Sequence, residues 1–278
     1  MLKSSTALAV VCLAAVPLGA AAQELPTKIK DAGKIVVANQ PNYPPMEYRD
    51  PATNELKGLD IDLQTALAEK LGVEVEWQEV GFEQMISSLT TGRVDMIHSG
   101  MSDLEKRRDK LDFVDYMKSG AQFYTTVKNA DTFKTPADFC GKTVGMSRRT
   151  SFPDEAKKWS ATNCEGAGKE PLNVVGTEGS ADARTQLIQG RLDGAVQGSE
   201  TLPYLIEQSP DTFVTIGEPF TAVYQGMGFD KGATELRDAY VAALTDLIGS
   251  GKYAEIFEKW GLANAELETV MINNEPVK

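Results

Sequence analysis

The chain is organised around one short segment, Ser99-Gly100-Met101-Ser102-Asp103-Leu104-Glu105-Lys106-Arg107. An apolar run at 94–97 precedes the segment and a charged, helix-compatible run follows it, so we expect a strand that leads into the start of a helix. Unpaired backbone N–H groups at a helix start and the helix dipole both favour a bound anion. Arg107, one turn into this helix, would then help to hold a carboxylate. The alternative is that residues 105–110 form only a solvated charge run on a surface helix.

A segment of similar composition lies farther along the chain, Val144-Gly145-Met146-Ser147-Arg148-Arg149-Thr150-Ser151. Again an apolar run meets Gly-Met-Ser and is followed by arginine and hydroxyl side chains. Two such junctions could face each other across a cleft and hold one anionic ligand from both sides. The alternative is a chance similarity of a six-residue pattern.

Strand-like and helix-like segments alternate along the chain, which favours βαβ units and parallel sheets. We expect strands at 34–38, 73–77, 94–97, 122–127, 143–146, 172–175 and 192–196. We expect helices at 59–71, 85–89, 154–159, 181–189, 202–207, 235–248 and 253–260. Ligands of such sheets bind beyond the carboxyl ends of the strands, and Tyr43, Phe82 and residues 99–102 fall at or near expected strand ends.

The N-terminus has the pattern of a cleavable secretory signal over residues 1–22, with a basic start at Lys3, an apolar core and a small-residue exit at Ala20-Ala21-Ala22. We therefore expect a soluble exported protein of about 256 residues, one large domain or two small ones. The net charge of −12 becomes −13 when Lys3 is removed, which argues against nucleic acid or anionic lipid as a partner. No other apolar run approaches the roughly 20 residues of a membrane-spanning helix.

Two cysteines remain after the signal, Cys140 and Cys164, and in an oxidising compartment we expect them to form a disulfide bond. His98 is the only histidine, which argues against a multi-histidine metal site and a catalytic triad. We expect His98 to be packed near the cleft. The sequence predicts no cofactor and no metal.

The order of short motifs resembles that of the amino-acid-type periplasmic solute-binding proteins of ABC importers, family 3. The matching motifs span nearly the whole mature chain and are, in order, 42–46, 58–63, 81–83, 92–95, 100–107, 112–113 and 190–195. The resemblance implies the type II periplasmic-binding fold, with two α/β lobes that are each a sheet flanked by helices and are joined by a two-stranded hinge. We expect residues 23–118 and 226–278 in lobe 1 and residues 119–225 in lobe 2.

The resemblance also implies which residues bind the ligand. Tyr43 and Phe82 stand where the family has two aromatic side chains that sandwich the ligand, and Arg107 matches the arginine that pairs with the ligand α-carboxylate. The implied hydroxyl and amide contacts are Ser99, the N–H of Gly100, Ser102 and, from lobe 2, Thr150.

Several positions depart from the family pattern. Gln40 and Gly198 stand where the family usually has the acids near the ligand α-amino group, Leu104 replaces a usual threonine, and Arg149 replaces a usual glycine. A buried ammonium without a counter-charge is costly. Either Glu200 reaches into the site or the ligand is not an ordinary α-amino acid, and the added positive charge favours an anionic, carboxylate-bearing solute.

The resemblance implies a periplasmic monomer that captures its solute by lobe closure and delivers it to an ABC transporter permease. It implies no nucleic-acid partner and no stable membrane insertion. One alternative is a sensor or accessory protein that presents its closed form to a receptor. Another is a dehydratase-like enzyme on the same fold, for which Glu200 is the only candidate acid and no conventional base is present.

Overall fold

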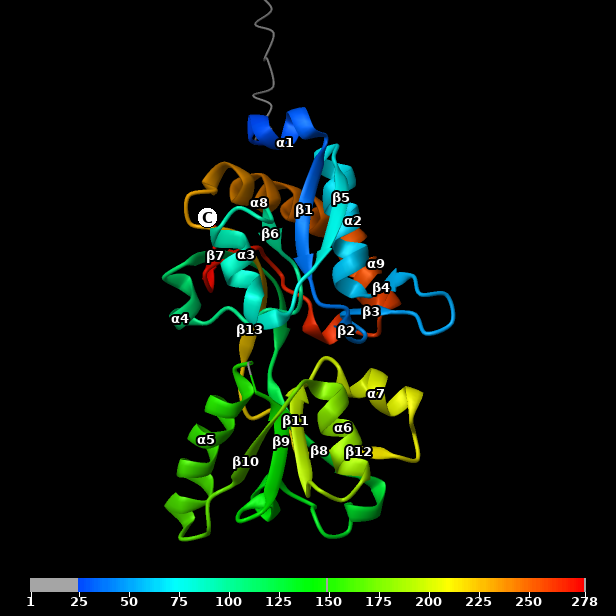
Figure 1. Ribbon diagram of the computed structural model, residues 1–278, viewed down its shortest axis with the longest axis vertical. Helices are drawn as coiled ribbons and strands as arrows, with labels where there is room; N and C mark the ends of the chain where they lie inside the picture. Colours follow the sequence, from blue (N-terminus) through cyan, green and yellow to red (C-terminus); the bar gives the residue numbers. More distant parts are fainter. Residues whose placement is uncertain (1–24, 149, 278) are drawn as a thin grey trace, which may run out of the picture.

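The computed structural model describes residues 25–148 and 150–277, and it contains two α/β lobes stacked end to end (Figure 1). The predicted signal peptide, residues 1–22, lies outside the described residues. Lobe 1 is built on a seven-stranded sheet and lobe 2 on a five-stranded sheet. The fold class predicted from the sequence is confirmed.

Lobe 1 contains the sheet β15-β14-β7-β13-β6-β1-β5, in which β1 pairs in parallel with β5 and β6. Its strands are β1 (Lys34–Asn39), β5 (Glu74–Glu79), β6 (Met96–Ile97), β7 (Leu111–Ser119), β13 (Val223–Asp230), β14 (Met271–Ile272) and β15 (Glu275–Pro276). A small antiparallel sheet beside it consists of β2 (Asn42–Tyr43), β3 (Glu47–Arg49) and β4 (Leu56–Lys57).

The helices of lobe 1 include both predicted C-terminal helices. They are α1 (Thr27–Ala32), α2 (Leu59–Leu71), α3 (Met85–Thr90), α4 (Glu105–Arg108), α8 (Thr234–Gly249) and α9 (Lys252–Lys259), with short 3₁₀ turns at Phe82–Gln84 and Ala263–Ala265. In α2, the residues Leu59, Leu63 and Leu67 recur every four positions and are buried on one face. Gly72 ends α2 in the left-handed conformation that glycine adopts without steric cost, as its position predicts.

Lobe 2 contains the sheet β10-β9-β11-β8-β12. Its strands are β8 (Ala121–Thr126), β9 (Thr143–Ser147), β10 (Asn173–Thr177), β11 (Gly194–Gly198) and β12 (Phe213–Ile216). Its helices are α5 (Phe152–Asn163), α6 (Ser180–Ile188) and α7 (Leu202–Gln208), with 3₁₀ turns at Val127–Asn129, Pro136–Phe139 and Glu165–Ala167. Cys140 and Cys164 form the predicted disulfide bond, against the buried aromatic core around Phe123 and Phe139.

Two adjacent strands connect the lobes. β7 ends at Ser119, and only Gly120 separates it from β8. The chain returns through β13, where Val223 pairs with Ser119. Figure 1 shows both strands leaving lobe 1 toward lobe 2. This pair is the two-stranded hinge of the predicted fold, and the exact boundaries at 118/119 and 225/226 stay a proposal.

The central segment differs from its predicted form. Helix α4 has only four residues, because Leu111 already begins β7, and Ser102 forms an isolated bridge with Gln225 of β13. A helix this short has little macrodipole, so the helix dipole adds little to anion binding by this segment. None of the helices in the described part of the chain combines the length and apolar character that spanning a bilayer requires.

Candidate functional site

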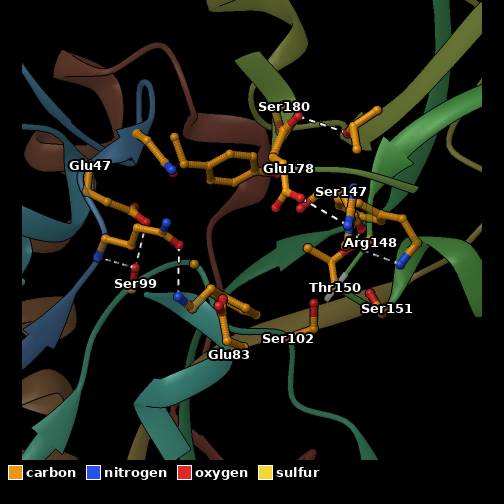
Figure 2. A pocket seen from close by; sticks show the side chains of 18 of the residues that line it. Glu47, Glu83, Ser99, Ser102, Ser147, Arg148, Thr150, Ser151, Glu178 and Ser180 are labelled. Atoms are coloured by element: carbon orange, nitrogen blue, oxygen red, sulfur yellow. Dashed lines mark hydrogen bonds and ion pairs between the residues drawn. The ribbon is translucent and has the colours of Figure 1, made fainter. Parts of the chain in front are cut away.

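A cavity of about 820 Å³, including its open mouth, lies between the two lobes. Lobe 1 and the hinge contribute Gln40, Asn42, Tyr43, Glu47, Phe82, Glu83, Ser99, Gly100, Ser102, Arg107 and Gln225. Lobe 2 contributes Ser147, Arg148, Thr150, Ser151, Phe152, Thr177, Glu178, Gly179 and Ser180. Figure 2 shows Glu47 and Ser99 across the cavity from Ser147 and Arg148.

Both Gly-Met-Ser junctions reach this cavity, so the structure brings the two predicted halves of the site together. Ser147 ends β9 and Thr177 ends β10, which places the lobe 2 wall at the carboxyl ends of two parallel strands. Eight of the ten predicted ligand-binding residues line it: Gln40, Tyr43, Phe82, Ser99, Gly100, Ser102, Arg107 and Thr150. Arg149 lies outside the described residues.

Arg107 is half-buried in the wall of the cavity. Its Nη1 donates to the carbonyl oxygen of Ser102 at 2.7 Å, and its guanidinium carbon lies 5.6 Å from the ring centre of Phe82. Burial lowers the pKa of Arg107 to about 10, even though the nearby carboxylates of Glu155 and Asp103 raise it. The guanidinium therefore carries a charge that the protein only partly compensates, on a fork whose shape suits a carboxylate.

Ser99 and Gly100 are already bonded to protein carboxylates. Ser99 Oγ donates to Glu47 Oε1 at 2.8 Å, and the Gly100 N–H donates to Asp60 Oδ2 at 2.8 Å. The expectation that the Gly100 N–H is available to a ligand is thus wrong for this conformation. Gln40 has a structural part as well, since its Oε1 accepts a hydrogen bond from the Phe82 N–H at 3.0 Å.

Glu47 is the main residue that sequence reasoning missed. It pairs with Tyr43 across the β2–β3 hairpin, is 2% exposed and lines the cavity. Its Oε2 is buried without a hydrogen-bond partner among the described residues, and burial, together with Asp60, raises its pKa well above the ordinary range. The available sequence signal was that Glu47 directly follows the motif at 42–46. The β2–β3 hairpin that turns Glu47 toward the cavity was not predicted.

The lobe 2 wall carries both charge and hydroxyl groups. Arg148 is exposed and forms an ion pair with Glu178 at 2.9 Å, so its charge is compensated within the protein. Thr150 Oγ1 donates to the Ser147 carbonyl oxygen at 2.8 Å and accepts from the Phe152 N–H at 3.3 Å. These bonds fix the turn between β9 and α5, and with it the place of the Thr150 hydroxyl at the cavity.

Gly198 does not line the cavity, so the prediction that it binds the ligand is corrected. A Cβ built on Gly198 would lie 2.1 Å from Glu200 Oε1 and 2.4 Å from the Tyr43 hydroxyl, and these groups fill the space beside it. Glu200 is 4% exposed, and its carboxylate accepts a hydrogen bond from the Tyr43 hydroxyl at 3.0 Å. Glu200 therefore lies behind Tyr43, outside the cavity lining.

His98 is packed inside lobe 1, as predicted, but it does not line the cavity. Its ring is fully buried, its Nδ1 lies 3.0 Å from Gln64 Oε1, and its edge meets the Tyr116 ring at a centroid distance of 4.8 Å. Burial lowers the pKa of His98 to about 3, so the ring is neutral. Within residues 25–148 and 150–277, no cluster of three or more metal-ligating side chains is present.

Comparisons with known proteins agree with this geometry. The model of the bacterial extracellular solute-binding proteins, family 3, matches residues 35–263. The arginine-binding protein of Corynebacterium glutamicum is 30% identical over 253 residues, 91% of this chain and 82% of that protein. The L-cystine-binding protein of Bacillus subtilis is 29% identical, over 85% and 84%. The crystal structure of an ancestral amino acid-binding protein, a precursor of cyclohexadienyl dehydratase, is 28% identical with a TM-score of 0.75, over 84% and 97%.

Proposed function

The chain belongs to the bacterial extracellular solute-binding proteins of family 3, and on this premise we propose that it captures an α-amino acid between its lobes and delivers it to an ABC transporter permease. Its two lobes and two-stranded hinge suit a clamp, in which the ligand contacts both lobes and stabilises their closed arrangement. The relatives that bind arginine and L-cystine support an amino acid as the ligand class.

Arg107 is the observation that carries this proposal. Its charge is partly buried and only partly compensated, so a ligand carboxylate in the cavity would restore the missing counter-charge. Its planar fork favours a bidentate pair with that carboxylate. Ser102 and Thr150 line the same cavity from the two lobes and supply hydroxyl groups for the closed complex.

Glu47 is the proposed partner of the ligand ammonium group. It supplies the buried acid that Gln40 and Gly198 lack, and its unpartnered Oε2 can accept a hydrogen bond from an ammonium. A cavity lined by the partly compensated guanidinium of Arg107 and by a buried Glu47 carboxyl group whose Oε2 has no partner suits a zwitterion. An ammonium beside Glu47 would also favour the ionised carboxylate, whose formation burial otherwise opposes.

The preference for an anionic ligand that the sequence indicates is not retained. That preference rested on the missing acids, whereas Glu47, Glu83 and Glu178 all line the cavity. Arg148 does not add a free positive charge, because it is paired with Glu178. We propose that a neutral or cationic amino acid binds more tightly than a dicarboxylate.

The cellular setting is part of the same proposal. We propose that residues 1–22 direct export and are removed, and that the mature protein acts in the periplasm as a monomer. The enzyme alternative loses its candidate acid, because Glu200 is enclosed by Tyr43 and the hinge. A sensor protein could use the same ligand cavity but would dock on a receptor instead of a permease. The surfaces of the two lobes would determine which of these partners is bound.

A thermal-shift panel tests the proposal. Residues 23–278 are mixed with L-arginine, L-histidine, L-cystine, L-glutamine, L-glutamate and succinate, each at several concentrations. A ligand at 100 times its dissociation constant adds about 2.7 kcal/mol to the free energy of unfolding, which raises the midpoint visibly. We expect the largest rise from a neutral or cationic amino acid. The largest rise from succinate, or no rise from any amino acid, would overturn the proposal.

A further inference from the structure

One hydrogen-bond cluster crosses the cleft beside the ligand cavity and links the two lobes directly through protein groups. Tyr43 belongs to β2 of lobe 1, and Glu200 follows shortly after β11 of lobe 2. The Tyr43 hydroxyl donates a hydrogen bond to Glu200 Oε1 at 3.0 Å. The same hydroxyl accepts from the N–H of Gly198, the last residue of β11, at 3.1 Å. One side chain of lobe 1 is therefore bonded twice to lobe 2.

The Glu200 carboxylate also binds both strands of the hinge. Ser119 Oγ, at the end of β7, donates to Oε2 at 2.6 Å, and Gln225 Nε2, in β13, donates to Oε1 at 2.7 Å. Three side-chain donors thus satisfy a carboxylate that is 4% exposed. A buried acid of this kind is stable only while its donors stay in place, so its environment depends on the closed arrangement of the lobes.

Gly198 is required by this cluster for space. Its φ lies outside the left-handed region, so the backbone itself would accept another residue. A Cβ at this position would nevertheless lie within 2.4 Å of both the Tyr43 hydroxyl and Glu200 Oε1. Any side chain at 198 would displace the bond between Tyr43 and Glu200, so this glycine and this acid act as one unit.

We propose that Tyr43, Gly198 and Glu200 form a clasp that closes the lobes in the absence of ligand and holds the Tyr43 ring in place as a wall of the ligand cavity. In this role Glu200 is a positioning residue: it acts on the ligand site only through Tyr43. The clasp does not depend on which solute the cavity binds. Because a closed unliganded state already has the ligand-binding geometry, the ligand need not drive the whole lobe closure.

Another contact between the lobes is an exposed ion pair, which provides a control. Lys106 and Asp154 form an ion pair at 2.9 Å between α4 and α5, but both side chains are exposed. Exposed ion pairs contribute little, because water and salt screen them. Lys106→Ala therefore removes a contact between the lobes without touching the clasp.

Small-angle X-ray scattering of the unliganded protein tests the clasp. Tyr43→Phe keeps the ring and removes both hydrogen bonds to lobe 2, which shifts the ratio of closed to open molecules toward open by about tenfold to a hundredfold. Gly198→Ala disrupts the same bonds because its added methyl group would overlap the Tyr43 hydroxyl and the Glu200 carboxylate. Circular dichroism checks that each variant is folded. We expect wild type and Lys106→Ala to scatter as the closed structure and both clasp variants to have a larger radius of gyration.

Two results would overturn this inference. One is an unliganded wild type that already scatters as an open two-lobe particle, a result that needs no variant. The other is a folded Tyr43→Phe or Gly198→Ala protein whose radius of gyration equals that of wild type. Since no solute is present in either measurement, both results are independent of whether the cavity binds an amino acid.

Discussion

Replacing Arg107 by alanine removes the only proposed contact for the ligand carboxylate that carries a positive charge. Burial lowers the pKa of Arg107 from its ordinary value to about 10. This change corresponds to about 3 kcal/mol of unfavourable environment for the charged guanidinium. A carboxylate paired with the fork recovers an energy of that order, and hydrogen bonds to charged groups contribute about 1.5 to 3 kcal/mol. We expect Arg107→Ala to weaken binding about 100- to 1,000-fold.

Isothermal titration calorimetry measures this loss, with L-arginine, L-histidine and L-cystine as probes. Arg107→Lys keeps the charge but not the fork, and we expect a smaller loss of about tenfold. Arg148→Ala is the matched control, because Arg148 lines the same cavity but is exposed and already paired with Glu178. We expect its affinity to stay within about fivefold of wild type, since an exposed, paired charge contributes little.

Two outcomes would contradict the proposed role of Arg107. A folded Arg107→Ala protein that binds its best amino acid within threefold of wild type would show that the carboxylate is held elsewhere. Equal losses in Arg107→Ala and Arg148→Ala would point instead to the overall charge of the cavity. Thermal unfolding of both unliganded variants distinguishes lost binding from lost folding.

Three further changes have defined outcomes. Burial raises the pKa of Glu47 and a bound ammonium favours its ionised form, so binding should release protons and should tighten as the pH rises above the ordinary carboxyl range. Calorimetry in buffers of different ionisation enthalpy should show this release in wild type and not in Glu47→Gln. Cys140 and Cys164 are separated by 24 residues in the sequence, and replacing both by serine opens the loop that their disulfide closes. Urea unfolding should then give a free energy of unfolding that is lower by about 3 kcal/mol. A decrease below about 1 kcal/mol would argue against the chain-entropy account. His98 has a pKa lowered to about 3, so only the unfolded state takes up its proton below pH 6.5; the stability of wild type relative to His98→Gln should therefore fall as the pH drops from 6.5 toward 3, and parallel curves would contradict this.

Periodic apolar spacing and glycine punctuation predicted many of the helices and strands, whereas the two-lobe arrangement was implied by the family resemblance. The helix at 59–71 is confirmed to the residue, because its buried leucines recur at four-residue spacing and Gly72 ends it. The β2–β4 sheet and the β14–β15 hairpin were missed, since two- and three-residue strands leave no periodic pattern. The longer strands β7, β12 and β13 were missed as well; β7 and β13 are buried along most of their length, so their burial does not alternate with a period of two. Helix α4 was predicted too long because charge and helix propensity do not reveal where the next strand begins.

The candidate site was predictable where a motif fixes a residue at a strand end, and not where packing turns a side chain. Arg107 and Thr150 lie in the two Gly-Met-Ser segments and both line the cavity. Glu47 reaches the cavity only through the β2–β3 hairpin, which the sequence did not predict. Gly198 was predicted to bind the ligand but does not line the cavity, because Tyr43 and Glu200 fill the space beside it.

The central claim is that the cavity binds both charged groups of an α-amino acid, the carboxylate at Arg107 and the ammonium near Glu47. The most direct measurement is the affinity of the wild-type protein for L-arginine, for agmatine, which lacks the carboxylate, and for 5-guanidinopentanoate, which lacks the ammonium. We predict that L-arginine binds and that each analogue binds at least 100-fold more weakly. Either analogue binding within tenfold of L-arginine, or no binding of L-arginine, L-histidine or L-cystine, would contradict the account.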